Sequence, residues 1–135
     1  MIINRRSDYA CRIIREAYQC GENYVSVSEV AERENIPYAF ARSIQHDLVH
    51  AGLLKTIRGA HGGLALACDP CTTTVLDVLE ALQGPLCSAN CCMNPCDCEK
   101  SQECEFNKVW REGDRLLREY YGSVRLSDLF ESSKQ

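Results

Sequence analysis

Apolar residues recur at helical spacing in three short runs along the first fifty positions. The first run predicts a helix over residues 7–20, because its apolar positions lie three or four residues apart. Ser26 followed by Glu29 matches a capping box, which predicts a short helix over residues 29–34. Pro37 suits the first position of a third helix. The expected inward positions are Ala10, Ile13, Ile14 and Ala17 in the first helix, and Phe40, Ile44 and Leu48 in the third, which runs to about Ala51.

The pattern after Gly52 changes to two short stretches of strand type. Residues 53–58 and 64–67 predict two strands, and the glycines of segment 59–63 predict a tight turn between them. Three short helices followed by such a hairpin form the arrangement of a winged helix-turn-helix. The predicted fold is therefore mainly α with a small β-hairpin wing. A small helical core with a purely structural hairpin would give the same pattern, so the pattern favours DNA binding without establishing it.

A cysteine-rich segment interrupts the helical pattern in the second half of the chain. Thr74 is placed to cap a helix over residues 75–83, a last long helix is expected over 105–121, and a tail over 126–130 is expected to fold back. In the first of these helices Val75, Val78, Leu79 and Leu82 are the expected inward residues. The chain divides into a winged helix-turn-helix DNA-binding domain (1–83), a cysteine-rich cluster-binding loop (84–104), and a dimerisation helix with a C-terminal tail (105–135).

Composition and charge restrict the partners and the compartment. With 45% hydrophobic and 25% charged residues, the chain has the composition of a globular protein. The net charge is −4, but residues 1–66 carry +1 and residues 67–135 carry −5, so an anionic partner is expected to meet the N-terminal half. No secretory leader and no apolar stretch of membrane-spanning length is visible, so we expect a cytoplasmic protein with no membrane partner.

The second helix of a helix-turn-helix enters the major groove, and here that helix follows Pro37. Arg42 is placed to donate two hydrogen bonds to guanine, although contact with phosphate is an equally good interpretation. Arg58, among the wing glycines, is placed to enter a narrow minor groove. The residues predicted to contact DNA are Tyr38, Ala39, Arg42, Ser43, His46, Arg58 and His61, with Arg5, Arg6 and Lys55 on phosphates or simply in solvent.

Ten cysteines, six of them within residues 87–104, indicate soft-metal or redox chemistry. Disulfide frameworks belong to secreted domains, whereas dense cysteine in a reducing compartment favours metal ligation. Zinc sites commonly use CxxC pairs and this segment holds none, but the density of cysteines by itself does not choose iron over zinc. Cys68 and Cys71 form a CxxC motif after the wing. A redox pair and a purely structural role are both open interpretations of this motif. Cys11 and Cys20 fit small core residues.

Four features of the chain follow a known pattern. They are Ser7-Asp8-Tyr9-Ala10, Ala51-Gly52-Leu53-Leu54, the wing Arg58-Gly59-Ala60-His61-Gly62-Gly63, and Cys92, Cys98 and Cys104, with five residues between neighbours, ahead of a helix with Trp110. Together they resemble the winged-helix iron–sulfur transcription regulators of the IscR and NsrR type, the Rrf2 family. The resemblance covers nearly the whole chain, and the wing is its most specific motif.

The resemblance implies a homodimer in which each subunit holds one cluster through Cys92, Cys98 and Cys104. In NsrR-like members a carboxylate near the start of the partner's first helix is the fourth ligand, and Asp8 matches that position. IscR-like members use a histidine where this chain has Asn107. The resemblance therefore favours a 4Fe-4S over a 2Fe-2S cluster. An oxygen ligand is more easily displaced than a thiolate, which favours nitric oxide as the signal.

Extra cysteines depart from the family pattern and leave the ligand set open. Of the vicinal pair Cys91-Cys92, spacing favours Cys92 as the ligand. Asp8 also fits a simpler interpretation, a carboxylate that complements the dipole of its own helix. The alternative ligands are Cys87, Cys91, Cys96, Cys68 and Cys71.

The last helix carries an apolar stripe that a lone helix would leave wet. Packing within the chain would cover it, but we expect a homodimer that crosses the two long helices. A two-fold dimer implies double-stranded DNA with an inverted-repeat operator. The residues expected at the dimer contact are Phe106, Val109, Trp110, Leu116, Leu117 and Tyr120.

The sequence thus predicts a DNA-binding regulator, a repressor and not an enzyme, controlled by a cluster that senses nitric oxide, oxygen or redox state, or iron–sulfur status. Iron–sulfur assembly machinery is a further expected partner. The alternatives are a thiol- or zinc-based redox-sensing regulator and, more distantly, an iron–sulfur electron carrier or cluster-transfer protein. No Rossmann or P-loop glycine motif and no paired acid–base constellation is visible.

Overall fold

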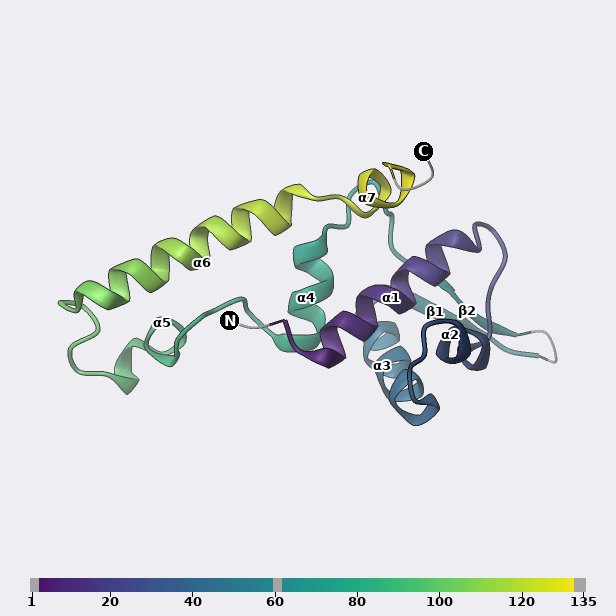
Figure 1. Ribbon diagram of the computed structural model, residues 1–135, viewed down its shortest axis with the longest axis horizontal. Helices are drawn as coiled ribbons and strands as arrows, with labels where there is room; N and C mark the ends of the chain where they lie inside the picture. Colours follow the sequence, from purple (N-terminus) through teal and green to yellow (C-terminus); the bar gives the residue numbers. More distant parts are fainter. Residues whose placement is uncertain (1–2, 60–61, 133–135) are drawn as a thin grey trace.

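The computed structural model describes residues 3–59 and 62–132, which form a winged domain and a long arm (Figure 1). This confirms the predicted fold class, a mainly helical chain with one two-stranded hairpin. In chain order the elements are α1 (Arg5–Gln19), α2 (Val27–Arg33), α3 (Tyr38–His50), β1 (Leu54–Ile57), β2 (Gly63–Leu66), α4 (Val75–Gln83), α5 (Asn90–Met93), the 3-10 helix η1 (Pro95–Asp97), α6 (Glu105–Ser123) and α7 (Leu126–Ser132).

The first two helices start at side-chain caps. Asn4 Oδ1 accepts a hydrogen bond from the Ser7 N–H at 2.8 Å, so α1 starts two residues earlier than predicted. Ser26 accepts from the Glu29 N–H at 3.1 Å, as a capping box requires. The Glu29 carboxylate, however, pairs with Arg33 at 3.3 Å, so the expected return bond is replaced by an i,i+4 ion pair.

The recognition helix α3 differs from the expectation at two positions. Pro37 is the N-cap and not the first helical residue. Phe40, expected inside, is 44% exposed and lies edge-on against Tyr9 at 6.0 Å. Ala41 takes the inward position beside Ile44 and Leu48, because a small side chain there lets α3 pack closely on α1. The buried residues of α3 are Ala41, Ile44 and Leu48.

The wing is an antiparallel hairpin that is also tied to the segment before α2. Leu54 pairs with Leu66 and Ile57 with Gly63, so β1 is one residue shorter at each end than predicted, and β2 starts and ends one residue earlier than predicted. Val25 forms a further bridge to Leu64, with N···O distances of 3.1 and 2.7 Å. A Cβ on Gly63 would lie 2.3 Å from the Val25 carbonyl oxygen, so this approach requires glycine.

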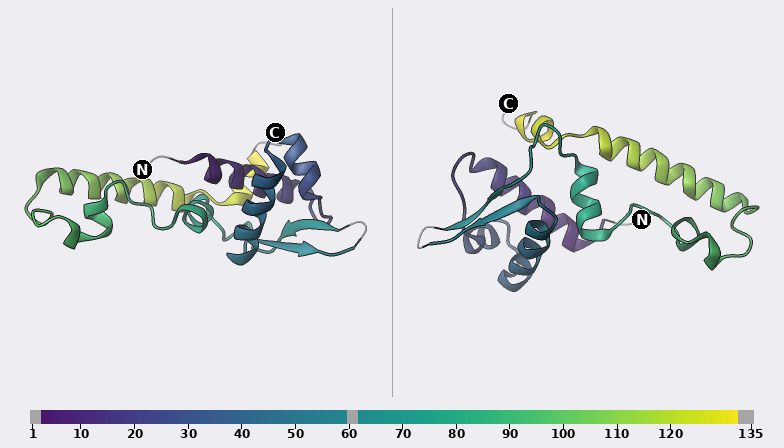
Figure 2. Two further views of the ribbon diagram at one scale, coloured as in Figure 1. Left: turned by 90° about the horizontal axis from the view of Figure 1, so that it is seen from below. Right: turned by 180° about the vertical axis from the view of Figure 1, so that it is seen from behind.

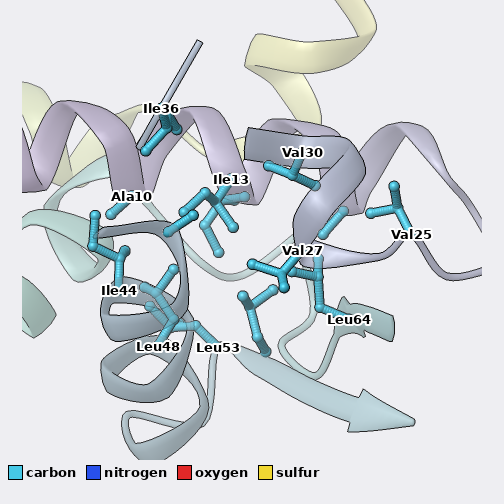
Figure 3. Packing of buried hydrophobic residues seen from close by; sticks show 14 of the residues in the cluster. Ala10, Ile13, Val25, Val27, Val30, Ile36, Ile44, Leu48, Leu53 and Leu64 are labelled. Carbon is cyan, nitrogen blue, oxygen red and sulfur yellow. The ribbon is translucent and has the colours of Figure 1, made fainter. Parts of the chain in front are cut away.

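One hydrophobic core joins α1, α2, α3 and the wing (Figure 3). Ile13 of α1 is fully buried between Ile44 of α3 and Val30 of α2, and Leu64 carries the core into the hairpin. Burying an aliphatic side chain of this size contributes roughly 1.5–3 kcal/mol. The core therefore fixes where the recognition helix and the wing stand relative to each other.

Helix α4 connects this core to the arm. Thr74 caps it in a complete capping box with Asp77, at the predicted position. Val78 and Leu79 are buried as expected, whereas Val75 and Leu82 are half-buried. Helix α6 packs on α4, and α5 packs on α6, so the arm extends away from α2, α3 and the hairpin (Figures 1 and 2).

The C-terminal tail folds back onto the winged domain, as predicted. Arg125 bridges to Thr74, and α7 follows at once. Phe130 is buried, with its ring 5.0 Å from the ring of Tyr18 on α1. The tail thus holds the end of α6 next to α1.

Gly63→Ala should destabilise the protein by about 1–3 kcal/mol, because the new Cβ overlaps the Val25 backbone. Gly122→Ala is the matched control, since a Cβ there meets only the Leu76 side chain at 3.5 Å, an ordinary contact. Urea unfolding measures both free energies. Equal stability of the two variants would contradict the packing of the wing on the Val25 segment.

Candidate functional site

The residues predicted to contact DNA and the loop cysteines lie in different parts of the molecule. Helix α3 and the hairpin belong to the winged domain, whereas α5 lies at the far part of the arm beside α6 (Figures 1 and 2). Any control of DNA binding by the cysteines must therefore pass through helix packing. The two regions are described in turn.

The outward face of α3 carries the predicted base-contacting residues. All of them are exposed, while their neighbours Ala41, Ile44 and Leu48 are buried. Arg42 and His46 also line a pocket of about 230 Å³ with Thr56 of β1, so the helix and the wing form one continuous surface. The exposed residues on this face are Tyr38, Ala39, Arg42, Ser43 and His46.

The wing and the start of α1 supply the residues predicted to contact the minor groove (Arg58) and the phosphates (Arg5 and Lys55). Lys55 and Arg58 are exposed on the hairpin, and Arg5 is exposed in the first turn of α1. His61 lies outside the described residues. These positions give the winged surface three exposed cations, and their contact with DNA stays a prediction.

Arg6 has a different position from the one predicted. Its guanidinium donates to Ser43 Oγ at 3.1 Å and forms an ion pair with Asp47, so it joins α1 to the recognition helix. No local sequence signal marks this pairing, because the partners are 37 and 41 residues away. Arg6 is thus a positioning residue for α3 in this structure, and Ser43 is held by the protein's own arginine.

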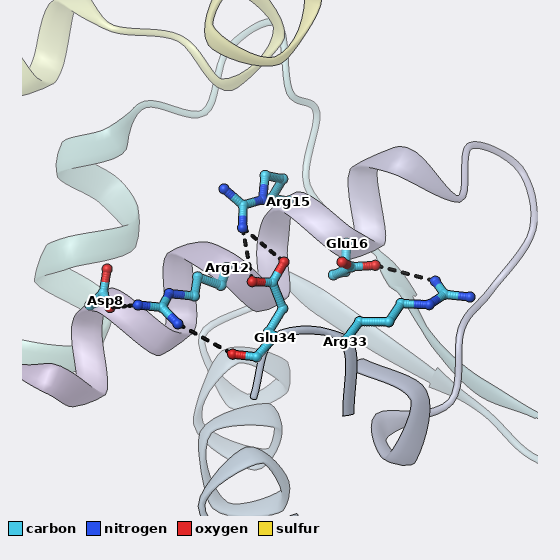
Figure 4. A network of polar contacts seen from close by, with 6 residues as sticks. All are labelled: Asp8, Arg12, Arg15, Glu16, Arg33 and Glu34. Carbon is cyan, nitrogen blue, oxygen red and sulfur yellow. Dashed lines mark hydrogen bonds and ion pairs between the residues drawn. The ribbon is translucent and has the colours of Figure 1, made fainter. Parts of the chain in front are cut away.

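A chain of ion pairs fixes α1 against the turn before α3 (Figure 4). Arg12 pairs with Asp8 at 2.7 Å and donates to the Glu34 carbonyl at 3.3 Å. Arg15 holds the Glu34 carboxylate through two hydrogen bonds of 2.8 and 2.9 Å. The Asp8 side chain forms an i,i+4 ion pair within α1 and is 49% exposed, so a group outside this chain can still reach its carboxylate.

In the arm, the structure brings together two thiols and a carboxylate from three segments. The ligand atoms of Cys87, Cys92 and Asp114 all lie within 4.8 Å of one another. Cys87 follows α4, Cys92 is in α5, and Asp114 is a buried residue of α6. Sequence reasoning missed Asp114, although its spacing of seven from buried Asn107 puts both on the polar side of α6.

Asn107 contributes an amide to the same group of thiols. It is 3% exposed, and its Nδ2 donates to Cys91 Sγ at 3.2 Å and to Cys92 Sγ at 3.7 Å. Arg111 Nε donates to Asn107 Oδ1 at 2.8 Å, which fixes the orientation of the amide. The two sulfurs therefore face a donor that stabilises negative charge on them.

The other candidate ligands are dispersed. Among the described residues, Cys98 and Cys104 join no group of three potential ligands within that distance. Cys96 and Cys98 are exposed, Cys104 is half-buried at the start of α6, and Cys91 sits on Asn107. Cys68 packs against the core, and the exposed Cys71 donates its N–H to Asp69 in a turn.

Burial and charge raise the pKa of three thiols. Burial, followed by Cys91 and Cys87, raises the pKa of Cys92, with Asp114 adding to the effect. Burial and then Asp8 raise the pKa of Cys11 to about 11. Burial also raises the pKa of Cys20. Cys11 and Cys20 both pack against the core, in line with the structural role expected for them.

Helix α6 exposes its apolar stripe to solvent. Phe106 stacks on Trp110 with ring centroids 6.0 Å apart, and both side chains are open to water. The predicted dimer residues Phe106, Val109, Trp110, Leu116, Leu117 and Tyr120 are all at least 36% exposed. The stripe therefore finds no cover within the described part of its own chain.

Comparison with known proteins identifies the family of this chain. The model of the Rrf2 family, described as an iron-dependent transcriptional regulator, matches residues 3–132. The chain belongs to the Rrf2 family. It is 28% identical to the HTH-type transcriptional regulator CymR of Bacillus subtilis strain 168, over 130 residues that cover 96% of this chain and 89% of CymR.

Solved structures of Rrf2 proteins agree in fold. The structure of CymR, the global cysteine regulator of B. subtilis, superposes with a TM-score of 0.77 at 26% identity and covers 98% of both chains. The T. potens IscR superposes with a TM-score of 0.79 at 25% identity, over 98% of this chain and 88% of IscR.

Together, the comparisons make this Rrf2 protein a transcription regulator and not an enzyme. Within the part of the chain that the structure describes, no helix has both the length and the apolar character needed to cross a membrane.

Cys11 should resist alkylation. A pKa of about 11, against an ordinary 9.0, leaves roughly a hundredfold less thiolate near pH 8. The Cys11 thiol should also make the free energy of unfolding depend on pH. Unfolded chains release this proton near pH 9 and folded chains only near pH 11. The free energy of unfolding therefore falls as the pH rises through that window. Mass spectrometry after a timed iodoacetamide pulse should find Cys96 and Cys98 modified first. Equal labelling of Cys11 would show that it is not enclosed.

Proposed function

We propose that this Rrf2 regulator is a repressor whose binding to an inverted-repeat operator is controlled by an iron–sulfur cluster. The observation that carries the proposal is the density of thiols in the segment 87–104 beside α6, on an arm that α4 joins to a winged domain. The iron-dependent character of the family supports the choice of metal. A 4Fe-4S cluster is preferred to 2Fe-2S, and nitric oxide, oxygen or redox state, or iron–sulfur status is the signal.

The residues present fit such a group. Six thiols lie within residues 87–104, and this segment contains only two short helical turns in addition to its loops. Cys92, Cys98 and Cys104 would hold the cluster, with Asp8 of the partner subunit as the fourth ligand. Within one chain Asp8 belongs to α1 and Cys92 to the arm, so a second subunit is the natural source of the carboxylate.

Ligation of Asp8 would act on the recognition helix through α1. When bound, the cluster supplies iron that reacts with small oxidants or nitric oxide. Asp8, which pairs with Arg12 here, would hold the cluster through its carboxylate, and this would restrain the first turn of α1. Arg6 lies in the same turn and donates to Ser43 of α3. The position of α3 is thus coupled to the occupancy of Asp8 through the direct contacts of Arg6.

A second candidate, thiol-based sensing without a cluster, is favoured by one observation. Cys87 and Cys92 have their sulfurs within 4.8 Å, with Asn107 donating to Cys92. Peroxide would join these two thiols as a disulfide, with both protons leaving in two water molecules. The similarity to CymR, described as the global cysteine regulator of B. subtilis, supports a regulatory role linked to cysteine.

Anaerobic purification followed by iron and sulfide analysis tests the cluster. Wild-type protein should be brown with both elements present, and Cys98→Ala should lose the cluster together with its effect on operator affinity. Cys20→Ala, whose thiol packs on the core, is the matched control and should keep both. The operator is obtained by selecting bound duplexes from random DNA.

Arg58→Ala in the same assay reports on the wing alone. It should weaken operator binding by about tenfold or more in both states of the protein. A colourless wild-type protein that takes up no cluster on reconstitution would overturn the cluster proposal. Operator binding that responds to peroxide would then select the thiol sensor.

Leu116→Glu should disrupt the homodimer. The stripe on α6 that contains Leu116 is exposed in the single chain, and a carboxylate buried there without a partner would weaken association by about a hundredfold. Lys108→Glu, an equal addition of a carboxylate on α6 outside the stripe, should leave the dimer intact. Sedimentation equilibrium measures both constants. A monomeric wild type, or a dimer unaffected by Leu116→Glu, would contradict the assignment.

A further inference from the structure

Asp114 is a buried carboxylate that lacks a cationic partner. It is 8% exposed, and its Oδ1 accepts one hydrogen bond from the Ser88 N–H at 3.0 Å. Among the described residues, no lysine or arginine forms an ion pair with it. A buried negative charge is costly unless a cation or several donors compensate it. Among the described residues, one backbone hydrogen bond and no ion pair therefore stabilise the Asp114 carboxylate.

The arginines near Asp114 are engaged elsewhere. Arg111, Arg115 and Arg118 line the same pocket of about 450 Å³. Arg111 donates to Asn107, Arg115 to Glu112 and Glu119, and Arg118 to Glu80. The groups that do approach the carboxylate are the thiols of Cys87 and Cys92. A carboxylate and two thiols to which none of these arginines is paired form a donor set that a borderline-soft dication can use.

The spacing of these donors suits a single ion. Donor atoms around a tetrahedral zinc lie roughly 3.3–3.8 Å apart, as follows from bond lengths of about 2.0–2.3 Å. The three ligand atoms here lie within 4.8 Å of one another, so each pair must close by at most about 1.5 Å to share one ion. The open pocket leaves a fourth position for water.

We propose that Cys87, Cys92 and Asp114 bind one zinc-class divalent ion within each single chain. Secondary contacts support the site: the Ser88 N–H orients Asp114, and the Asn107 amide stabilises the charge on Cys92. The proposal does not rest on the cluster, and it needs no partner subunit. Because both use Cys92, the ion and the proposed cluster exclude each other.

Occupancy of this site would have a structural consequence for the arm. Cys87 lies after α4, Cys92 in α5 and Asp114 in α6. An ion that joins them fastens the α4–α5 connection and α5 itself to the long helix. It also holds Cys92 away from Cys98 and Cys104, so the ion opposes assembly of the cluster.

Titration with Co²⁺ tests the proposal, since tetrahedral Co²⁺ bound by thiolates gives characteristic visible and charge-transfer bands. The full chain is reduced, freed of metal under anaerobic conditions, and titrated with Co²⁺ alone. One ion per chain should bind, and Zn²⁺ should displace it. Cys87→Ser and Asp114→Asn should each weaken Co²⁺ binding by at least about tenfold. Circular dichroism of every metal-free variant establishes that it folds.

Two kinds of variant make the test specific. Cys98→Ser and Cys104→Ser belong to the proposed cluster set alone, and both should bind Co²⁺ as wild type does while failing to reconstitute a cluster. Asp114→Cys keeps a donor at the position and should retain Co²⁺ with a stronger sulfur charge-transfer band.

The outcomes separate the two proposals. Co²⁺ binding that needs Cys98 and Cys104 but not Cys87 and Asp114 would overturn this site and leave the cluster standing. A wild type that binds no Co²⁺ would also overturn it. Intact Co²⁺ binding in a chain that never takes up iron and sulfide would support the site and remove the cluster.

Discussion

The buried face of α1 is the constraint on which the other parts of the molecule depend. Ile13 and Ile14 are fully enclosed, and α1 packs against α3, β2 and α4 at once. Loss of a buried aliphatic side chain at such a position costs about 2–5 kcal/mol, a large part of the stability of a small protein. One helix thereby sets the position of the recognition helix, the wing and the helix that carries the arm.

Polar contacts around this core join the start of α1 to the recognition helix α3. Arg6 reaches from the first turn of α1 to Ser43 and Asp47 on α3, and Arg12 in the next turn holds Asp8. Exposed ion pairs of this kind contribute little to stability, so their importance lies in geometry. They couple the orientation of α3 to the start of α1, which is the route by which the proposed cluster would affect the recognition helix.

Helix α6 exposes its apolar side and buries part of its polar side, the reverse of an ordinary surface helix. Its apolar residues face solvent, while Asn107 and Asp114 are buried against the cysteine segment. Both features follow from one amphipathic helix whose two sides have different surroundings. The apolar side provides surface for a second copy of the chain, and the polar side brings an amide and a carboxylate to the thiols. The arm is thus both the proposed dimer contact and the proposed place of metal binding.

The sequence by itself determined the order of the helices and the hairpin, because helical and strand periodicities, Gly52 and Thr74 are local signals. It also determined that the exposed face of α3 carries Arg42 and His46, since periodicity separates that face from Ile44 and Leu48. Phe40 was assigned to the wrong face because three apolar positions four residues apart leave the margin of the stripe ambiguous, and only packing on α1 selected Ala41. The pairing of Arg6 with Asp47, and the meeting of Asp114 with Cys87 and Cys92, were decided by tertiary structure alone. Those partners are far apart in the chain, and no local propensity encodes which distant side chains helix packing will bring together.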